Sequence, residues 1–364
     1  MTSPLKPRPG ILAISPYVGG DATAEGANRV IRLASNENPL GPSPKAIQAY
    51  LDLQGELHRY PDGGSNDLRS AIGASEGIER DRIVCGAGSD ELISLLVRAY
   101  AGPGDEVLYS EHGFLMYPIS AKAVGATPVA SPEHNLTTDV DEMLAQTTAR
   151  TRLVFVANPN NPTGTYLSAD ELRRLRRGLP DHVLLVIDAA YAEYVEADDY
   201  SAGAELVTEF ENVVMTRTFS KIHGLANLRL GWAYCPPAVA DVLNRLRGPF
   251  NVSQPAQAAG IAAIEDKSHV ERSRQHNTKW LAWFNEEVAK LGLEPGDCVG
   301  NFALVKFPDS RDKSAAVALS YLKTRGILLR AMGGYGLPDY LRVTIGTEDE
   351  TRSVVEALGR FLTD

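Results

Sequence analysis

The run Val183-Leu-Leu-Val-Ile-Asp188 is apolar at five consecutive positions and then ends in a carboxylate. A strand with apolar residues on both faces is typical of a parallel sheet that helices cover on each side. Because an unpaired carboxylate is costly at the end of a buried strand, Asp188 is expected to meet a cation there. In a second interpretation, Asp188 only caps the turn that follows its strand. The run therefore predicts an α/β fold and one candidate functional position.

Other segments of the chain repeat this alternation of strands and helices. Strands are expected at residues 82–85, 106–109, 153–157, 213–216 and 229–235, with helices among them at 90–101 and 169–177. These segments predict a large α/β domain over residues 36–249. A smaller α+β domain is expected over residues 250–364, with helices near 255–264, 270–291 and 314–323 and strands near 302–307, 327–330 and 340–345. The proline-rich residues 1–35 are expected to form an arm over a neighbouring surface.

The composition limits the partners of this chain. It has 364 residues, 44% of them hydrophobic and 23% charged, and a net charge of −10. An acidic protein is not attracted to nucleic acid or to anionic membranes, and the apolar runs are too short to span a bilayer. Three scattered cysteines without CxxC spacing argue against disulfides or a zinc site and predict buried free thiols. The histidines show no metal-binding spacing, so we expect a cytoplasmic protein without a metal.

Parallel sheets bind ligands outside the carboxyl ends of their strands, so the residues that follow each strand are the candidates for a site. After the first strand comes Gly86-Ala-Gly-Ser-Asp-Glu91, in which Ser89 is expected to cap a helix. The preceding glycines let an anion approach the backbone N–H groups of Gly88, Ser89 and Asp90. A capped turn without a ligand is the structural alternative. A dinucleotide site is disfavoured, because its motif needs glycine where Glu91 stands.

A second strand end carries Ala157-Asn-Pro-Asn-Asn-Pro-Thr-Gly164. Its prolines and turn-forming residues predict at least a rigid loop. In a functional interpretation, the amide of Asn161 donates a hydrogen bond to a ring oxygen. The Asn161–Pro162 bond is then a candidate cis peptide that holds this amide in place.

A lysine follows a further strand, in Thr218-Phe-Ser-Lys-Ile-His-Gly-Leu-Ala-Asn-Leu-Arg-Leu-Gly231. Lysines at strand ends are mostly solvated, and this is the structural alternative for Lys221. However, the hydroxyl of Ser220 and the guanidinium of Arg229 could hold a phosphate-bearing aldehyde while the Lys221 amine condenses with it. That chemistry describes pyridoxal 5'-phosphate (PLP) bound as a Schiff base. His223, for which the sequence offers no partner, is expected at the surface.

Together, the strand ends supply every group that PLP needs. The phosphate is expected to contact Gly88, Ser89, Asp90, Ser220 and Arg229. On the ring, Asp188 would pair with the nitrogen, while Asn161 and Tyr191 would donate to the phenolic oxygen. Phe114, which follows the strand at 106–109, would stack on the ring face.

The chain resembles the fold-type I PLP-dependent aminotransferases over essentially its full length, and within class II it is most similar to the histidinol-phosphate aminotransferase family. The resemblance rests on Leu33-Ala-Ser-Asn-Glu-Asn-Pro-Leu-Gly41, Arg59-Tyr-Pro-Asp62, Asn158–Gly164, Asp188-Ala-Ala-Tyr191, Ser220-Lys221 with Arg229, and Leu341-Arg-Val-Thr-Ile-Gly346. It implies a mainly parallel seven-stranded sheet and a homodimer in which Tyr60 reaches the partner's cofactor phosphate. The chain departs from the family pattern at Ala189, at Ile222-His223 and at Asn227, and none of these removes a cofactor contact.

The same resemblance implies the reaction. Lys221 would shuttle a proton during ping-pong transamination between L-histidinol phosphate and 2-oxoglutarate, which gives imidazole-acetol phosphate and glutamate in histidine biosynthesis. Arg330 and Arg342 would bind the phosphate of one substrate and the carboxylate of the other in turn. Tyr17 would cover the substrate, and Asn36 would lie at the mouth of the pocket. For Arg330, an ordinary surface charge is the structural alternative.

Three alternative functions keep a PLP site. The first is an aromatic aminotransferase that acts on tyrosine or phenylalanine, as the main or as a second activity. The second is a PLP lyase similar to threonine-phosphate decarboxylase, which would release carbon dioxide instead of forming glutamate. The third is a PLP-sensing module, and it is disfavoured because the chain has no basic domain for nucleic acid.

Overall fold

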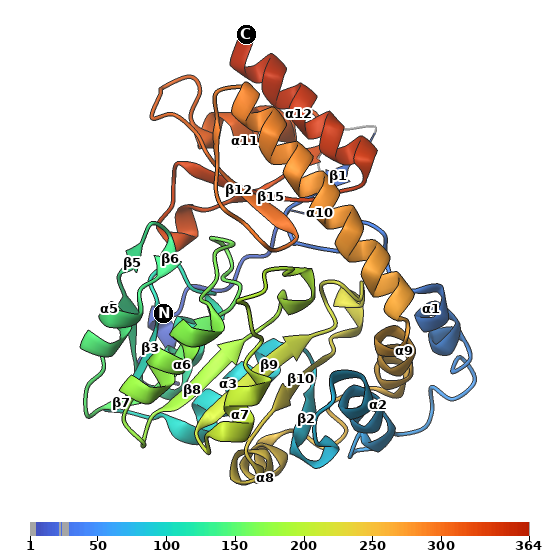
Figure 1. Ribbon diagram of the computed structural model, residues 1–364, viewed down its shortest axis with the longest axis vertical. Coiled ribbons are helices and arrows are strands. Elements are labelled where there is room, and N and C mark those ends of the chain that lie inside the picture. Colours follow the sequence, from blue (N-terminus) through green and yellow to red (C-terminus); the bar gives the residue numbers. More distant parts are fainter. Residues whose placement is uncertain (1–4, 22, 24–28, 364) are drawn as a thin grey trace.

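A computed structural model describes residues 5–21, 23 and 29–363 of the chain. The predicted N-terminal arm therefore falls partly outside the described residues, at positions 1–4, 22 and 24–28. Figure 1 shows a large sheet between helices, with a smaller sheet and the C-terminal helices at one end of it.

Seven strands form the central sheet, in the order β2-β10-β9-β8-β7-β3-β4. Neighbouring strands are parallel except at β10, which is antiparallel to both β2 and β9. The strands are β2 (Ile83–Gly86), β3 (Glu106–Ser110), β4 (Thr127–Ser131), β7 (Thr151–Ala157), β8 (Leu184–Asp188), β9 (Val213–Thr218) and β10 (Gly231–Tyr234). This arrangement confirms the prediction of a mainly parallel, seven-stranded sheet.

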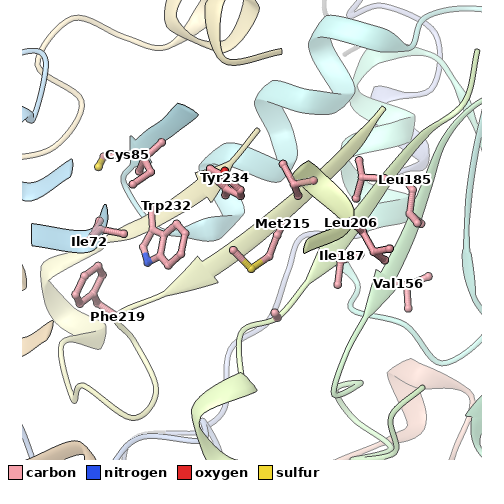
Figure 2. Packing of buried hydrophobic residues seen from close by; sticks show 14 of the residues in the cluster. Ile72, Cys85, Val156, Leu185, Ile187, Leu206, Met215, Phe219, Trp232 and Tyr234 are labelled. Atoms are coloured by element: carbon pink, nitrogen blue, oxygen red, sulfur yellow. The ribbon is translucent and has the colours of Figure 1, made fainter. Parts of the chain in front are cut away.

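Helices cover both faces of this sheet (Figure 1), and the burial of β8 shows the consequence. Leu185 and Ile187 pack in the hydrophobic cluster on one face, part of which Figure 2 shows. Leu184 and Val186 pack in a second cluster on the other face. Both faces of the strand are therefore buried, which explains why the Val183–Asp188 run is apolar at consecutive positions. The helices are α1 (Pro44–Leu51), α2 (Asn66–Glu76), α3 (Ser89–Tyr100), α4 (Met116–Val124), α5 (Val140–Ala145), α6 (Ala169–Gly178), α7 (Ala204–Glu209), α8 (Pro237–Leu246) and α9 (Gln254–Glu265).

The C-terminal part has a sheet and a core of its own. Its four strands have the order β11-β12-β15-β14, and a cluster that includes Trp280 and Phe284 packs against them. β1 pairs with β13 in parallel, so the N-terminal segment joins this part of the molecule. The elements are β1 (Ile31–Arg32), α10 (Lys267–Lys290), β11 (Glu294–Pro295), β12 (Phe302–Lys306), α11 (Ala315–Lys323), β13 (Ile327–Leu328), β14 (Arg330–Ala331), β15 (Tyr340–Thr344) and α12 (Glu348–Thr363); β5 (Glu133–His134) and β6 (Thr137–Thr138) form a separate hairpin.

The structure corrects three details of the sequence prediction. The prediction missed β4, an edge strand that contains Pro128 and is mostly exposed or half-buried, so its apolar pattern is weak. The strand expected at 229–235 begins only at Gly231, because Arg229 has a left-handed backbone with a φ of 51°. The strand expected at 327–330 is two short strands with different partners, β13 beside β1 and β14 beside β15.

The prediction of buried free thiols at Cys85, Cys235 and Cys298 is confirmed.

Candidate functional site

A cavity of about 370 Å³ opens at the carboxyl ends of the central strands. It is lined by all the residues that the sequence predicted for the site except Gly88 and Tyr60. These lining residues are Tyr17, Asn36, Ser89, Asp90, Phe114, Asn161, Asp188, Tyr191, Ser220, Lys221, Arg229, Arg330 and Arg342. Side chains from both sheets and from the N-terminal segment therefore meet in one place.

Lys221 lies in the loop between β9 and β10, and its amine faces the cavity. The Lys221 Nζ donates to the carbonyl of Ser35 at 3.2 Å and lies 5.6 Å from the ring centre of Tyr191. Burial lowers the pKa of Lys221 to about 7, and the positive charge of Arg342 acts in the same direction. At neutral pH a large fraction of this amine is therefore uncharged, as a nucleophile or a proton acceptor requires.

The N-terminus of α3 and Arg229 form a cradle at one side of the cavity. Arg229 Nη2 donates to Asp90 Oδ1 at 2.8 Å, and Nη1 donates to the hydroxyl of Ser220 at 3.3 Å. Gly88 is the N-cap of α3, with a φ of 92°, so the prediction of Ser89 as the cap was wrong by one residue. A Cβ on Gly88 would lie 2.2 Å from Asp90 Oδ1 and 2.4 Å from Arg229 Nη2. Glycine at this position therefore lets Asp90 and Arg229 approach the start of α3 closely. A guanidinium beside a helix N-terminus favours an anion, which fits the phosphate of PLP.

Asp188 is buried at the end of β8, where its carboxylate lines the cavity. It accepts hydrogen bonds from the hydroxyls of Tyr117 at 2.9 Å and Thr216 at 3.2 Å. Burial raises the pKa of Asp188, and these two bonds offset part of that rise. A cation in the cavity would stabilise the carboxylate further, as the ring nitrogen of PLP could.

Tyr117, the strongest hydrogen-bond partner of Asp188, was not among the predicted site residues. Its ring stacks on Phe155, with centroids 4.6 Å apart, and packs edge-on against Phe114 at 5.9 Å. The signal that could have identified it is its place near Phe114, in the segment that leads from β3 into α4.

Asn161 connects the cofactor side of the cavity with the substrate side. Both Asn158–Pro159 and Asn161–Pro162 are cis peptides, so the predicted cis bond is confirmed. Asn161 Oδ1 accepts a hydrogen bond from Arg342 Nη1. The other end of the amide is its NH₂ group, which therefore remains the donor that can point to a ligand.

Arg342 and Arg330 come from neighbouring strands and line the same cavity. Arg342 is buried, and its Nη2 donates to the carbonyl of Ala34 at 2.8 Å. Arg330 is more exposed; its Nη2 donates to the carbonyl of Val18 at 2.7 Å, and its guanidinium lies 5.9 Å from the Tyr17 ring centre. Tyr17 packs edge-on against Phe114 at 6.3 Å, so the N-terminal arm bridges the two sides of the cavity.

The structure corrects the prediction for Asn36, which was expected at the mouth of the pocket. Asn36 is only 1% exposed, and its Nδ2 donates to the hydroxyl of Tyr191 at 2.9 Å. It therefore lies inside the site, in contact with a residue of the cofactor side. The sequence pattern could not show this, because the two residues are 155 positions apart.

The structure also corrects the prediction that His223 lies at the surface. His223 is buried, packs against the ring of Phe219, and has its Nε2 3.6 Å from Glu193 Oε1. Arg217 Nη2 lies 2.8 Å from the same carboxylate oxygen. Burial alone would raise the pKa of Glu193, but Arg217 and His223 outweigh it and lower that pKa to about 2. His223 belongs to the same loop as Lys221, between β9 and β10, so this cluster holds that loop in place.

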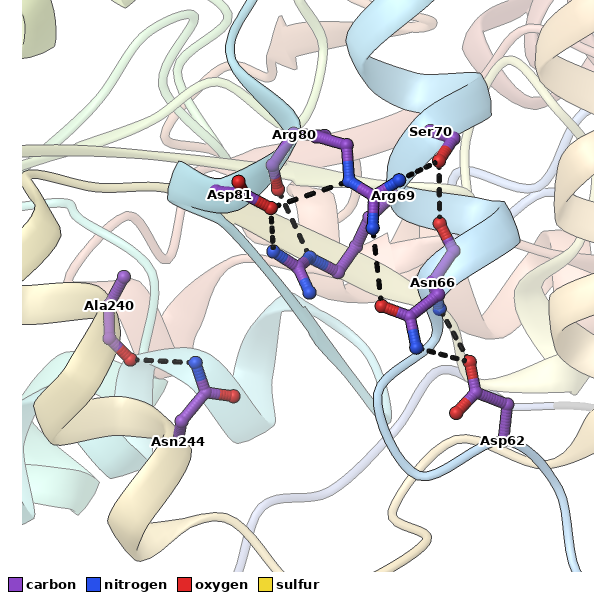
Figure 3. Close-up of polar contacts among 8 residues, drawn as sticks. All are labelled: Asp62, Asn66, Arg69, Ser70, Arg80, Asp81, Ala240 and Asn244. Carbon is purple, nitrogen blue, oxygen red and sulfur yellow. Dashed lines mark hydrogen bonds and ion pairs between the residues drawn. The ribbon is translucent and has the colours of Figure 1, made fainter.

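Tyr60 lies outside the cavity of its own chain. Its side chain is 83% exposed, and its ring stacks on Phe250 with centroids 4.7 Å apart. The segment that follows is held by Asp62, which accepts a hydrogen bond from Gly64 N at 2.9 Å. It also accepts one from Asn66 N at 2.7 Å, which Figure 3 shows. The side chain of Tyr60 is therefore exposed to solvent, next to a turn that hydrogen bonds to Asp62 stabilise.

A family model, related sequences and a solved structure all match this chain to aminotransferases. Residues 28–358 match the family model described as aminotransferase class I and II. The chain is 59% identical to a histidinol-phosphate aminotransferase of Paramagnetospirillum magneticum and 60% identical to one of Rhodospirillum centenum, over 100% of this chain and 99% of each relative. It superposes with a TM-score of 0.91 on the crystal structure of histidinol-phosphate aminotransferase from Sinorhizobium meliloti in complex with pyridoxal-5'-phosphate, which is 27% identical and covers 100% of this chain and 98% of the other. No helix among the described residues is long and apolar enough to cross a membrane.

Proposed function

The chain belongs to the aminotransferase class I and II family, and we propose that it transfers the amino group of L-histidinol phosphate to 2-oxoglutarate with PLP as its cofactor. The products are imidazole-acetol phosphate and L-glutamate, and the reaction is a step of histidine biosynthesis. The observation that carries this function is the identity of 59% and 60% to histidinol-phosphate aminotransferases along the whole chain. The cavity supplies the chemistry that such a reaction needs.

The residues of the cradle would hold the phosphate of PLP. The backbone N–H groups of Gly88, Ser89 and Asp90 lie at the N-terminus of α3, where the helix dipole favours an anion. Ser220 and Arg229 would close the cradle from the other side, because they are already hydrogen-bonded to each other there. Glycine at position 88 supports this assignment, because a Cβ there would lie 2.4 Å from Arg229 Nη2 and would displace the guanidinium from the start of α3.

Four side chains would orient the ring. Asp188 would pair with the ring nitrogen and keep it protonated, because its buried carboxylate gains most from a cation. Asn161 and Tyr191 would donate to the phenolic oxygen, and Phe114 would stack on the ring face. When it is bound, PLP supplies an electron sink that stabilises negative charge at the substrate Cα.

Lys221 would hold PLP and then move a proton. An amine with a pKa of about 7 can accept a proton from the substrate Cα and give it back at the C4' position of the cofactor. The carbonyl of Ser35, which accepts a hydrogen bond from Lys221 Nζ, would help to orient this amine.

Arg330 and Arg342 would bind the anionic end of each substrate in turn. Guanidinium groups form paired hydrogen bonds with a phosphate or a carboxylate, so one pocket can serve histidinol phosphate and then 2-oxoglutarate. Tyr17 lies beside Arg330 and Phe114, where it would cover the bound substrate.

A comparison of substrates tests this function. The enzyme is expected to have a much higher kcat/KM with histidinol phosphate than with phenylalanine or tyrosine, and to form glutamate from 2-oxoglutarate. Higher kcat/KM with phenylalanine would support the aromatic aminotransferase instead. Release of carbon dioxide without formation of glutamate would support a lyase.

The functional unit is proposed to be a homodimer in which Tyr60 reaches the partner's cofactor phosphate. Exposed apolar side chains on α1, on either side of it and at Phe250 support an interface here, because monomeric proteins rarely expose large apolar patches. These side chains are Leu40, Ile47, Tyr50, Leu51, Leu57, Tyr60 and Phe250. We also propose that residues 36–249 form the PLP-binding domain, that residues 250–364 form the smaller domain, and that the arm of residues 1–35 contributes to the smaller domain and to the dimer contact. The buried free thiols suit a reducing compartment, which supports a cytoplasmic location.

A further inference from the structure

Three consecutive residues of the N-terminal segment contact three functional side chains of the cavity. The carbonyl of Ala34 accepts a hydrogen bond from Arg342, and the carbonyl of Ser35 accepts one from Lys221. Asn36, the next residue, donates from its Nδ2 to the hydroxyl of Tyr191 at 2.9 Å. This short segment therefore determines how the side chains of the substrate arginine, the lysine and the tyrosine lie relative to one another.

Three further hydrogen bonds hold Asn36 in place. Its backbone N donates to Thr344 Oγ1 at 2.9 Å, and its carbonyl accepts from Asn301 Nδ2 at 3.0 Å. The hydroxyl of Thr344 donates back to Asn36 Oδ1 at 3.1 Å. Because Oδ1 accepts from Thr344, the NH₂ end of the amide is the one that faces Tyr191. The backbone has a φ of 56°, a left-handed conformation that asparagine tolerates better than most residues.

This contact determines the direction of the Tyr191 hydroxyl. A phenolic oxygen has one proton to donate, and here the oxygen accepts the N–H of Asn36. The proton of Tyr191 is therefore free to point into the cavity that Tyr191 lines. Burial raises the pKa of Tyr191, so this hydroxyl stays protonated, and available as a donor, at neutral pH.

We propose that Asn36 is a positioning residue, which directs the hydroxyl of Tyr191 toward the phenolic oxygen of the cofactor and does not bind the substrate. Through Thr344 the same asparagine connects Tyr191 with β15, the strand that carries Arg342. The inference rests on the proposed PLP site, but it does not depend on which amino donor the enzyme uses.

The test is a pH titration of the visible absorption of the PLP-loaded enzyme. A donor to the phenolic oxygen stabilises the deprotonated form of the bound chromophore, so the loss of a well-directed donor raises the pH of the transition. We expect Asn36→Gly, which suits the left-handed backbone, to raise the midpoint by about half a unit to one unit. Thr344→Val removes the group that orients the amide, and it should shift the midpoint in the same direction by a smaller amount.

A double-mutant comparison shows whether the effect passes through Tyr191. In a Tyr191→Phe background, Asn36→Gly is expected to cause no further shift of the midpoint. The proposal is overturned if Asn36→Gly shifts the titration midpoint equally in both backgrounds. It is also overturned if neither Asn36→Gly nor Thr344→Val shifts the midpoint. A higher KM for histidinol phosphate with an unchanged titration, which indicates a substrate contact, overturns it as well. If the enzyme binds PLP but does not transaminate histidinol phosphate, the proposed substrate is wrong and the titration still decides the role of Asn36.

Discussion

Arg330 and Arg342 face each other as directly paired residues of the antiparallel strands β14 and β15. Paired residues project their side chains to the same side of a sheet, and both guanidinium groups line the cavity. Two like charges in this position repel each other, and an anion between them removes that repulsion. The pair therefore forms a site that gains more from a doubly charged phosphate than from a neutral side chain.

Replacing Arg330 should reduce activity most strongly with the phosphate substrate. Hydrogen bonds to charged groups contribute about 1.5–3 kcal/mol, so Arg330→Gln should lower kcat/KM for histidinol phosphate about 10- to 100-fold. The loss with phenylalanine as amino donor should be smaller, because phenylalanine has no phosphate. Arg325→Gln is a suitable control, since Arg325 is exposed and stacks on Tyr321. Equal losses with both donors would show that Arg330 does not bind the phosphate.

The pKa of Lys221 predicts how the PLP-free protein takes up its cofactor. Only the neutral amine attacks the aldehyde, so the rate of PLP uptake should rise with pH and level off above about 7. Arg342 contributes to the low pKa, and Arg342→Gln should therefore move the midpoint to higher pH. Stopped-flow absorbance measures these rates. An unchanged midpoint in Arg342→Gln would contradict the electrostatic contribution of Arg342.

The lowered pKa of Lys221 also affects the stability of the PLP-free protein. The pKa of Lys221 falls from 10.5 to about 7 on folding, so the unfolded chain binds more protons between these values. This residue therefore makes the PLP-free protein more stable as the pH rises from about 7 to 10.5.

Gly88→Ala should weaken PLP binding without unfolding the protein. The new Cβ would displace Asp90 or Arg229, and the φ of 92° strains any residue other than glycine. We expect the affinity for PLP to fall, whereas the affinity for pyridoxal, which lacks the phosphate, should change little. Gly102→Ala is the control, because its Cβ would meet no atom within 4 Å. Equal losses for PLP and pyridoxal would place the phosphate elsewhere.

The sequence predicted the strand ends well because each is a local pattern, an apolar run followed by polar residues. Asp188, Lys221 and Asn161 could be identified in this way. Contacts that depend on tertiary structure could not be identified. The pairing of Arg330 with Arg342 depends on the register of two strands, and the hydrogen bond between Asn36 and Tyr191 joins residues 155 positions apart. His223 was misplaced for the same reason, because its partner Glu193 is 30 residues earlier in the chain.

The cluster of Glu193, Arg217 and His223 should stabilise the fold in a pH-dependent way. Removing one partner from a buried ion pair costs about 3–5 kcal/mol, and we expect Glu193→Gln to lower the free energy of unfolding by such an amount. The carboxylate has a pKa lowered from 4.5 to about 2. Its contribution is therefore complete above pH 4.5 and is lost as the pH falls toward 2.

Denaturant unfolding at several pH values measures this contribution. The difference between the native protein and Glu193→Gln should be largest at neutral pH and should shrink below pH 4.5. Glu196→Gln, at an exposed position on the same segment, is the control. A difference that does not change with pH would mean that packing, and not charge, explains the loss of stability.

Subunit mixing tests whether Tyr60 acts on the partner's site. Tyr60→Ala and Lys221→Ala should each inactivate a homodimer, the first by loosening the phosphate and the second by removing the amine. If Tyr60 reaches across the interface, a hybrid dimer has one site with both defects and one site with neither. Random exchange makes about half of the dimers hybrid, so about one quarter of all sites regain full function. No recovery in a mixture that forms hybrid dimers would show that Tyr60 serves its own subunit, since every site would then keep one defect.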